Sequence, residues 1–247
     1  MDEVAAALRA AGCVWADEEA AILRAHDGDL ATLLARRVAG EPLAHVTGWT
    51  TFGQRRLTVA PGVFVPRPRT ELLARMAAER ARAGSVVVEL CCGVAPVAAV
   101  VADASAESVV HGVDVDAAAL VCATENVPSG HFHRGDLFAA LPRTLARRID
   151  LLVASPPYVP SADLDLLDGD ARRHEPRSAH DGGPDGLTLA RRIVAEAGSW
   201  LAPHGRLLIE VARHQAAVLA EAFAAARLAS TVVRDDELGA TVVVNEP

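Results

Sequence analysis

The fold is decided by residues 86–101, VVVELCCGVAPVAAVV. The stretch opens as a valine-rich run typical of a buried strand, and this run closes on an acid, Glu89. Small residues suited to a tight turn follow, and Pro96 is well placed for the first turn of a helix. Such a turn lets a nucleotide-like ligand approach the backbone, although the GxGxxG pattern of dinucleotide-binding turns is absent. On its own, an ordinary strand-to-helix turn explains the stretch equally well. The residues expected around such a ligand are Glu89, Cys91, Cys92, Gly93 and Ala95.

From residue 70 onward, strand-like and helix-like segments alternate. Continuous apolar runs between helical segments are typical of parallel strands that are covered by helices on both faces. The sequence therefore predicts an α/β protein with a doubly wound sheet, whose ligand binds at the carboxyl ends of the strands. The expected strands are 85–90, 108–114, 131–134, 149–154, 205–211, 229–234 and 240–245. The expected helices are 70–83, 96–104, 116–125, 186–200 and 213–227.

The amino-terminal part of the chain has a different pattern. Residues 2–40 fall into three helix-like pieces with acids near their starts and glycines at their ends. The pattern then changes to short β-like pieces rich in glycine and proline. We therefore expect a small helical domain over 1–45, a linking β-hairpin over 46–69 and a larger α/β domain over 70–247.

Composition narrows the class of protein. The chain has 247 residues, a net charge of −8 and 51% hydrophobic residues, which suits one large domain with a small appendage. An acidic chain argues against nucleic acid as a partner, because broad phosphate binding needs clustered cations. The four cysteines form no CxxC pair, and no segment is typical of a signal peptide or membrane span.

His131 and His133 alternate on a strand without a third ligand at suitable spacing, so we expect at least one to face solvent. We expect no metal, no membrane partner and a cytoplasmic location.

Two further strand ends carry acids. Asp114 closes the run 108–114, where a carboxylate can accept hydrogen bonds from ribose hydroxyls, and Asp116 suits the cap of the following helix. Asp136 follows the run 131–134 and can accept a hydrogen bond from an adenine amino group, with Leu137 beside the ring. Because these acids and the turn at 89–95 follow successive strands, together they favour a nucleoside site.

Residues 154–160, ASPPYVP, form a rigid turn after the apolar run 149–154. Proline fixes φ and lacks an N–H group, so Pro156 and Pro157 hold the backbone in one shape. The Ser155 side chain and the Pro156 carbonyl can accept the N–H groups of an amide or amine, and so aim its lone pair at an electrophilic carbon. Tyr158 can wall the site and contact a positive charge.

These motifs together resemble those of S-adenosylmethionine-dependent methyltransferases, which carry (Asn, Asp or Ser)-Pro-Pro-(Tyr or Phe) at the position of Ser155–Tyr158. Two longer stretches are similar to HemK/PrmC-type protein-(glutamine-N5) methyltransferases, most closely to a PrmC-related short branch. They are residues 40–73, GEPLAHVTGWTTFGQRRLTVAPGVFVPRPRTELL, and 174–215, HEPRSAHDGGPDGLTLARRIVAEAGSWLAPHGRLLIEVARHQ.

The resemblance implies a Rossmann-like methyltransferase sheet behind a small N-terminal helical domain. It also implies S-adenosylmethionine as cofactor and, as acceptor, the glutamine of the GGQ motif in a partner protein, a peptide-chain release factor. The residues that it implies for cofactor binding are Arg67, Thr70, Glu89, Cys91, Cys92, Gly93, Asp114, Asp136 and Leu137. Catalysis falls to Ser155, Pro156, Pro157 and Tyr158, and the substrate side to Glu175 and Asp181. Glu71 completes the PR..TE signature near the pocket, which can also simply pin the linker to the next helix.

Three departures from the family pattern leave alternatives open. Ser155 stands where the family has asparagine, so it offers one oxygen where an amide would pair with the substrate. Val94-Ala95-Pro96 stands where glycine and serine are usual, and Ala95 does not adopt a positive φ as cheaply as glycine, so either the turn differs or the cofactor binds more weakly. The helical region is also short. The alternatives are a small-molecule (secondary-metabolite) methyltransferase, a DNA cytosine-N4 methyltransferase, and a degenerate paralogue that only binds cofactor or a protein.

Overall fold

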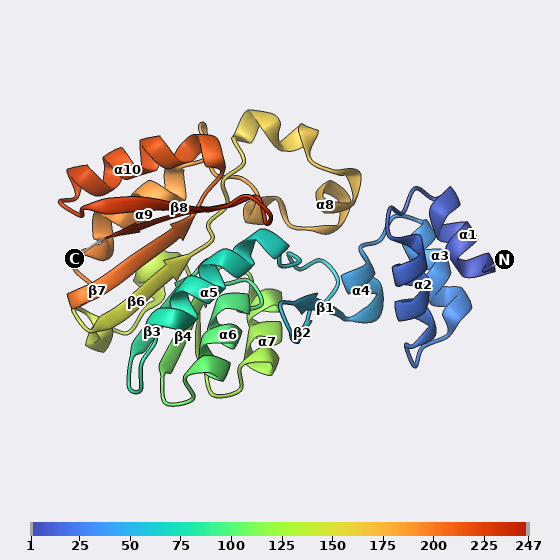
Figure 1. The fold of residues 1–247 in the computed structure, drawn as a ribbon, viewed down its shortest axis with the longest axis horizontal. Coiled ribbons are helices and arrows are strands. Elements are labelled where there is room, and N and C mark those ends of the chain that lie inside the picture. The colour runs from blue at the N-terminus through green and yellow to red at the C-terminus, as the bar shows by residue number, and fades with distance from the viewer. Residues whose placement is uncertain (1, 246–247) are drawn as a thin grey trace.

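A seven-stranded sheet forms the centre of the protein in the computed structural model, which describes residues 2–245 (Figure 1). The strand order is β5-β4-β3-β6-β7-β9-β8. The first five of these strands are parallel, whereas β9 runs antiparallel to both β7 and β8. The predicted α/β class with a mostly parallel sheet is confirmed. The strands are β3 (Val86–Leu90), β4 (Val109–Asp114), β5 (His131–Arg134), β6 (Ile149–Ala154), β7 (Leu201–Glu210), β8 (Ser230–Asp235) and β9 (Ala240–Asn245).

The order of the strands creates a switch point beside β3. The chain adds β4 and β5 on one side of β3 and then returns to place β6 on the other side. Loops that leave β3 and β6 therefore part in opposite directions, which opens a crevice at the carboxyl ends of these strands.

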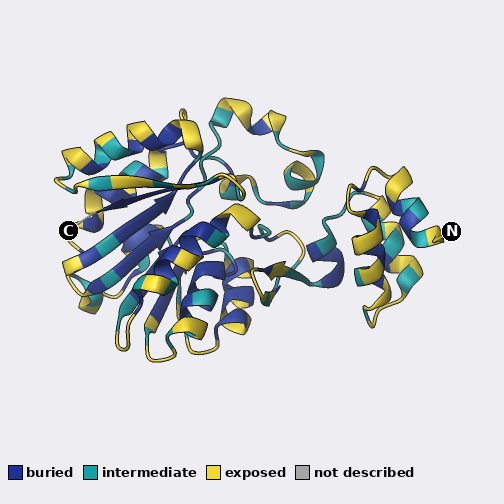
Figure 2. Ribbon diagram, viewed as in Figure 1, coloured by how far each residue is buried: buried dark blue, intermediate teal, exposed yellow. Residues whose placement is uncertain are grey.

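Helices cover both faces of the sheet because the strands are apolar on both sides (Figure 2). One face packs on α5 (Glu71–Arg80), α6 (Pro96–Ala104) and α7 (Ala117–Asn126). The opposite face packs on α9 (Thr188–Ala197) and α10 (Ala216–Ala225), together with the stacked rings of Phe138 and Trp200. Each expected strand and helix of this region is found, with β7 beginning four residues earlier than expected and α10 shortened at both ends.

The amino-terminal helices have a core of their own, lying to one side of the sheet (Figure 1). They are α1 (Glu3–Ala10), α2 (Ala16–Arg24), α3 (Leu30–Val38) and α4 (Leu43–Thr47). The expected boundary at residue 45 thus falls inside α4. The short hairpin of β1 (Trp49–Phe52) and β2 (Arg55–Thr58) follows, and it packs Phe52 and Leu57 into the core beside α5 and α7.

The hairpin is tied to the main domain by polar contacts. The Asn126 side chain accepts a hydrogen bond from the Thr58 N–H (2.7 Å), and it donates to the carbonyls of Thr58 (3.1 Å) and Val94 (3.0 Å). One buried amide therefore connects the hairpin, the end of α7 and the turn that follows β3.

The segment between β6 and α9 was not predicted to hold helices. It contains α8 (Gly169–His174) and the 3-10 turns Ser161–Leu166 and Arg177–Ala179. These turns fold back over the carboxyl ends of the strands (Figure 1). Among residues 2–245, no helix is both long and apolar enough to cross a membrane.

Candidate active site

A cavity of about 1240 Å³ lies at the carboxyl ends of β3, β4 and β6 and extends toward α2 and α4. The sequence-predicted residues that line it are Arg67, Thr70, Glu89, Cys91, Cys92, Gly93, Asp114, Asp136, Leu137, Ser155, Pro156, Pro157, Tyr158 and Glu175. Glu71, Ala95 and Asp181 stay outside its lining. The structure thus brings together most of the residues that the sequence scatters over more than 100 positions.

The turn after β3 is built from left-handed residues. Cys91 has φ 53°, Gly93 φ 52° and Ala95 φ 62°. Ala95 thus adopts by itself the left-handed conformation that glycine adopts more cheaply. A side chain in this conformation costs roughly 1 kcal/mol relative to glycine. A Cβ at Gly93 would meet no atom within 4 Å, so the turn leaves open space on the cavity side.

Glu89 fastens this turn to the start of α6. Its carboxylate accepts hydrogen bonds from the N–H groups of Val97 (3.3 Å) and Ala98 (2.7 Å), two of the unpaired donors at the helix start. Burial raises the pKa of Glu89 to about 8, although both N–H groups act in the opposite direction. The side chain that was expected to contact a ligand thus also anchors the local fold, and it lines the cavity.

Asp114 holds the turn from the neighbouring strand. One carboxylate oxygen accepts the Gly93 N–H (2.8 Å) and the other accepts the Asp116 N–H (2.9 Å). Burial raises the pKa of Asp114. Each oxygen has a further lone pair, so the carboxylate can still accept a ligand hydroxyl. Asp116 accepts the Ala118 N–H (2.8 Å), which confirms it as the cap of α7.

Asp136 and Leu137 follow β5 at the far side of the cavity. Asp136 forms a two-pronged ion pair with Arg192 of α9, at 2.8 and 3.2 Å. Leu137 is buried and left-handed, with φ 48°. In the turn after β3, burial raises the pKa of the Cys91 and Cys92 thiols. Each thiol is therefore a neutral packing group at neutral pH.

The SPPY turn ends β6 and is braced from behind. The carbonyl of Tyr158 accepts a hydrogen bond from Gln215 Nε2 (2.9 Å), and the backbone of residues 157–158 packs directly on Gly182 and Gly186. A Cβ at either glycine would come within 2.6 Å of these backbone atoms, so only glycine fits. The loop of residues 181–186, DGGPDG, therefore holds the rigid turn in place.

Asp181, which was expected on the substrate side, belongs to this bracing loop. Its Oδ1 accepts hydrogen bonds from Ser161 Oγ (2.5 Å) and the Gly183 N–H (3.0 Å). Its carboxylate closes a turn within the loop, and this explains why it does not line the cavity.

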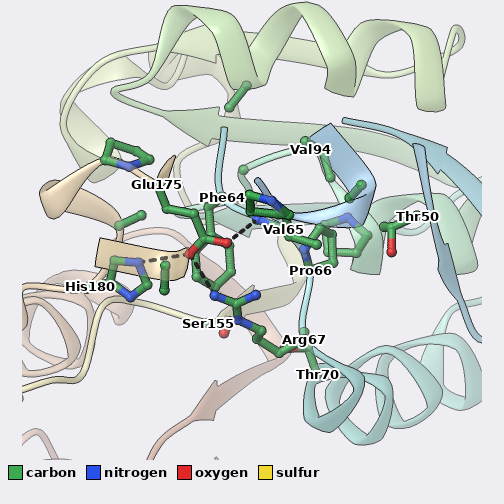
Figure 3. Close-up of a pocket in the computed structure, with 18 of the residues that line it drawn as sticks. Thr50, Phe64, Val65, Pro66, Arg67, Thr70, Val94, Ser155, Glu175 and His180 are labelled. Atoms are coloured by element: carbon green, nitrogen blue, oxygen red, sulfur yellow. Dashed lines mark hydrogen bonds and ion pairs between the residues drawn. The ribbon is translucent and has the colours of Figure 1, made fainter. Parts of the chain in front are cut away.

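Glu175, by contrast, is buried at the cavity wall. Figure 3 shows its carboxylate between His180, Arg67 and the backbone of Val65. The Glu175 carboxylate accepts hydrogen bonds from the Arg67 guanidinium (2.6 Å) and from the Val65 N–H (3.2 Å). His180 Nε2 lies 2.9 Å from the same carboxylate. The carboxylate therefore connects the PR..TE signature (residues 66–71) with the start of the stretch 174–215.

Sequence reasoning missed several residues of this site. Phe64 packs its ring edge against His180 (5.4 Å between centroids), and the Arg67 guanidinium lies over the same phenyl ring at 4.8 Å. Glu210 closes β7 and lines the cavity with a side chain that is almost entirely buried. An acid at the end of an apolar strand is the signal that identified Glu89 and Asp114, and it was equally readable at Glu210.

The histidines of β4 and β5 form a separate cluster. His111 Nδ1 lies 3.0 Å from His133 Nε2, and the His111 ring also packs on His131 at 4.9 Å between centroids. His131 is exposed, as expected for at least one of the pair on β5. Within residues 2–245, no three histidine, cysteine or acidic side chains are grouped so as to hold a metal ion.

Comparisons with known proteins place the chain among methyltransferases. Residues 55–167 match the model of the family "Methyltransferase small domain". The release factor glutamine methyltransferase of Gloeobacter violaceus is 39% identical over 198 residues, which is 76% of this chain and 68% of that protein. The enzyme of the same name from Streptomyces coelicolor is 38% identical over 189 residues, which is 74% of this chain and 67% of that protein.

Solved structures show the same fold at lower identity. A ribosomal protein L11 methylase from Lactobacillus delbrueckii superposes with a TM-score of 0.56 at 15% identity, covering 76% of this chain and 83% of that one. A 16S rRNA guanine-N2 methyltransferase from T. thermophilus, solved with S-adenosylmethionine and guanosine, also gives a TM-score of 0.56 at 20% identity, covering 80% and 49%.

Proposed function

The chain belongs to the release factor glutamine methyltransferase family, and from this premise we propose that it methylates the side-chain amide nitrogen of the GGQ glutamine in a peptide-chain release factor. It is an S-adenosylmethionine-dependent methyltransferase with a Rossmann-like sheet. The observation that carries the proposed substrate is the position of the SPPY turn, which lines the same cavity as the Gly93 turn, Asp114 and Asp136.

The residues present fit S-adenosylmethionine. The turn after β3 leaves open space beside Gly93, which gives a ligand access to the backbone. Asp114 retains free lone pairs for ribose hydroxyls, and Asp136 has one free lone pair on each oxygen for an amino group. When bound, the cofactor supplies a methyl group on a positively charged sulfur. We propose the roles of cofactor binding for the loop 91–93, Asp114, Asp136 and Leu137, with Arg67 and Thr70 on the opposite wall.

The SPPY turn acts on the acceptor nitrogen. An amide nitrogen is a weak nucleophile because its lone pair is delocalised into the carbonyl. Ser155 Oγ and the Pro156 carbonyl accept its two N–H groups, which fixes the direction of the lone pair before transfer. Pro157 and the bracing loop prevent this pair of acceptors from moving, and Tyr158 walls the site. Glu175 keeps the segment of Val65 and Arg67 in place.

The proposal is tested by intact-mass analysis of a release factor after incubation with this protein and S-adenosylmethionine. We expect the mass of one added methyl group, mapped by peptide fragmentation to the GGQ glutamine. A release factor with glutamate at that position is the matched control, because its side chain has the same size but no nitrogen to methylate. Binding of S-adenosylhomocysteine, measured by calorimetry on the same sample, shows that the protein is competent.

Ser155 favours one second candidate, a small-molecule methyltransferase. A serine offers a shorter and less directional acceptor than asparagine, and a metabolite amine does not need the amide-to-amide pairing that suits glutamine. Cofactor binding without methylation of the release factor, together with methyl transfer to an amine or amide metabolite, would replace the proposed substrate with this one.

A further inference from the structure

Glu210 is a buried acid whose chemistry the proposed roles leave unused. It is the final residue of β7, only 1% exposed, and it lines the cavity near the SPPY turn. A carboxyl group is rarely buried to this degree without partners, since desolvation disfavours its charged form.

Glu210 and Ser155 lie side by side, because β6 and β7 are adjacent parallel strands whose last pair of residues is Ala154 and Ile209. Side-chain interactions with Thr70 and Ser155 and the charge of Arg69 lower the pKa of Glu210, whereas burial raises it and has the largest effect. Tyr158 is the other titratable group that faces it, and Glu210 in turn helps to raise the pKa of the Tyr158 phenol. Within the described part of the chain, Oε2 of Glu210 has no hydrogen-bond partner. Thr70 and Ser155 line the same cavity as Glu210.

The reaction creates a need for such a group. An amide nitrogen that gains a methyl group carries one proton too many and must release it. The Pro156 carbonyl accepts a hydrogen bond but cannot pass a proton on, whereas the Ser155 hydroxyl both accepts and donates. Serine therefore offers a route that the asparagine of the family motif lacks.

We propose that Ser155 and Glu210 form a proton relay that removes the surplus proton from the methylated nitrogen. This inference rests on the proposed glutamine methylation. Glu210 acts through Ser155 and does not touch the substrate nitrogen. Before transfer it also positions Ser155, because a serine that donates its hydrogen to Glu210 turns its lone pairs toward the substrate N–H.

The atoms balance in three steps. The nitrogen bonds to the methyl carbon as the carbon–sulfur bond breaks, and the positive charge passes from sulfur to nitrogen. The nitrogen then gives one proton to Ser155 Oγ, while the proton already on Ser155 moves to the Glu210 carboxylate. Glu210 becomes a neutral acid and returns its proton to water when the product leaves. The relay requires an ionised Glu210 at the start, and Arg69 and Thr70 favour this charged state. A buried carboxylate is also a stronger base than an exposed one.

The pairing of Ser155 with Glu210 is tested first without cofactor or substrate. Carbon-13 NMR of glutamate-labelled protein follows the Glu210 carboxyl, identified by the signal that Glu210→Gln removes. We expect its titration midpoint to lie above that of exposed glutamates and to rise further in Ser155→Ala, because the hydroxyl that favours the charged form is gone. Ser199→Ala, an exposed serine ahead of β7, should leave the midpoint unchanged. A midpoint that does not move in Ser155→Ala overturns the relay.

The pH dependence of methyl transfer gives the second readout. For the wild type, kcat/KM should rise with pH through the Glu210 titration, since only the carboxylate can accept the proton. Glu210→Gln should be slower by roughly 100-fold and should lose this rise, within the range that proton transfer contributes in enzymes. Glu221→Gln, which removes an exposed carboxylate from α10, should behave as the wild type does. The same rise in Glu210→Gln would assign it to another group and overturn the relay.

The two proposals fail in distinguishable ways. A wild-type protein that binds S-adenosylhomocysteine but methylates no release factor overturns the substrate, while the NMR titration still decides whether Ser155 and Glu210 are paired. A Glu210→Gln variant that binds S-adenosylhomocysteine as the wild type does, yet methylates the release factor just as fast, overturns the relay and leaves the substrate in place.

Discussion

Ala95 adopts a backbone conformation that glycine usually supplies, and its neighbour Gly93 adopts nearly the same one. The strain at Ala95 falls on a buried residue that does not line the cavity, so it costs stability without filling the space for a ligand. Gly93 lines the cavity, and a side chain there would project into open space. The same left-handed conformation at positions 93 and 95 therefore has different consequences.

Gly93→Ala should weaken the binding of S-adenosylhomocysteine by at least about tenfold, with a loss of only about 1 kcal/mol in unfolding free energy. Calorimetry and urea unfolding measure the two quantities. Gly53→Ala is the matched control. Gly53 lies in the hairpin turn with φ 57°, and a Cβ there would also meet no atom within 4 Å. It should lose similar stability and bind normally. Equal affinities in the two variants would show that the Gly93 turn does not hold the cofactor.

Glu89 makes the stability of the domain depend on pH. Its pKa in the folded protein is about 8, above the ordinary value of 4.5, so the folded state holds the proton over a range in which the unfolded chain has released it. Unfolding free energy should therefore fall as pH rises from about 5 to 8 and then level off. Glu89→Gln should lose this part of the slope in urea unfolding at several pH values. A slope that persists unchanged in the variant would assign it to other groups.

Sequence patterns identified the acids at strand ends but did not separate their roles. Glu175 and Asp181 lie six residues apart in one block, yet one carboxylate is buried at the cavity wall and the other closes a surface turn. This difference depends on where the chain turns back after Arg177, which short polar segments do not reveal. Glu210 carries the same signal as Glu89, an acid at the end of an apolar strand.

At the scale of whole elements, apolar runs located the central strands β3, β4, β6, β7 and β9 because these are largely buried, whereas the edge strands β5 and β8 are more exposed. The same reasoning could not find α8 or the 3-10 turns around it. These pieces are three to six residues long, have little apolar periodicity, and take their shape from contacts to distant residues such as Val65 and Arg67.

The link between the hairpin and the Gly93 turn is another element-scale property. Asn126→Ala removes three hydrogen bonds and leaves backbone groups of Thr58 and Val94 unpaired. We expect a loss of about 2–3 kcal/mol in unfolding free energy, and weaker binding of S-adenosylhomocysteine because Val94 belongs to the turn. Urea unfolding and calorimetry measure these.

Asn245→Ala serves as the control for this variant. Asn245 is also a buried asparagine with backbone partners, but it joins β9 to β7 away from the turn. It should be destabilised while binding normally. If both variants bind alike, the hairpin does not support the cofactor turn.

At the scale of the whole molecule, Arg37 connects the amino-terminal helices with the segment that covers the cavity. It donates to Glu19 over 2.7 Å within the helical unit, and it lies 3.4 Å from Asp170 of α8. The first pair is largely shielded from solvent, whereas Asp170 is more exposed. The two contacts should therefore differ in strength.

Arg37→Ala should destabilise the helical unit by about 2 kcal/mol, because Glu19 loses a charged hydrogen-bond partner. Asp170→Asn should change stability by less than about 1 kcal/mol, as expected of an exposed pair. Hydrogen exchange of α1 to α3 reports the first effect, and faster exchange confined to α8 reports the second. Equal effects of the two substitutions would contradict this division.

The position of β9 has a consequence for how the protein is made. β9 lies between β7 and β8, although it is synthesised after both. A ribosome adds roughly 5–20 residues per second, so the 30 positions from Glu210 to Ala240 take about 2–6 seconds. During that interval the edge of β7 has no neighbour, and β8 has none either. The nascent chain therefore carries an open sheet edge that can pair with other chains. A chaperone bound to the nascent chain, the rate of translation and the protein concentration should affect this mispairing most while residues 211–240 are synthesised.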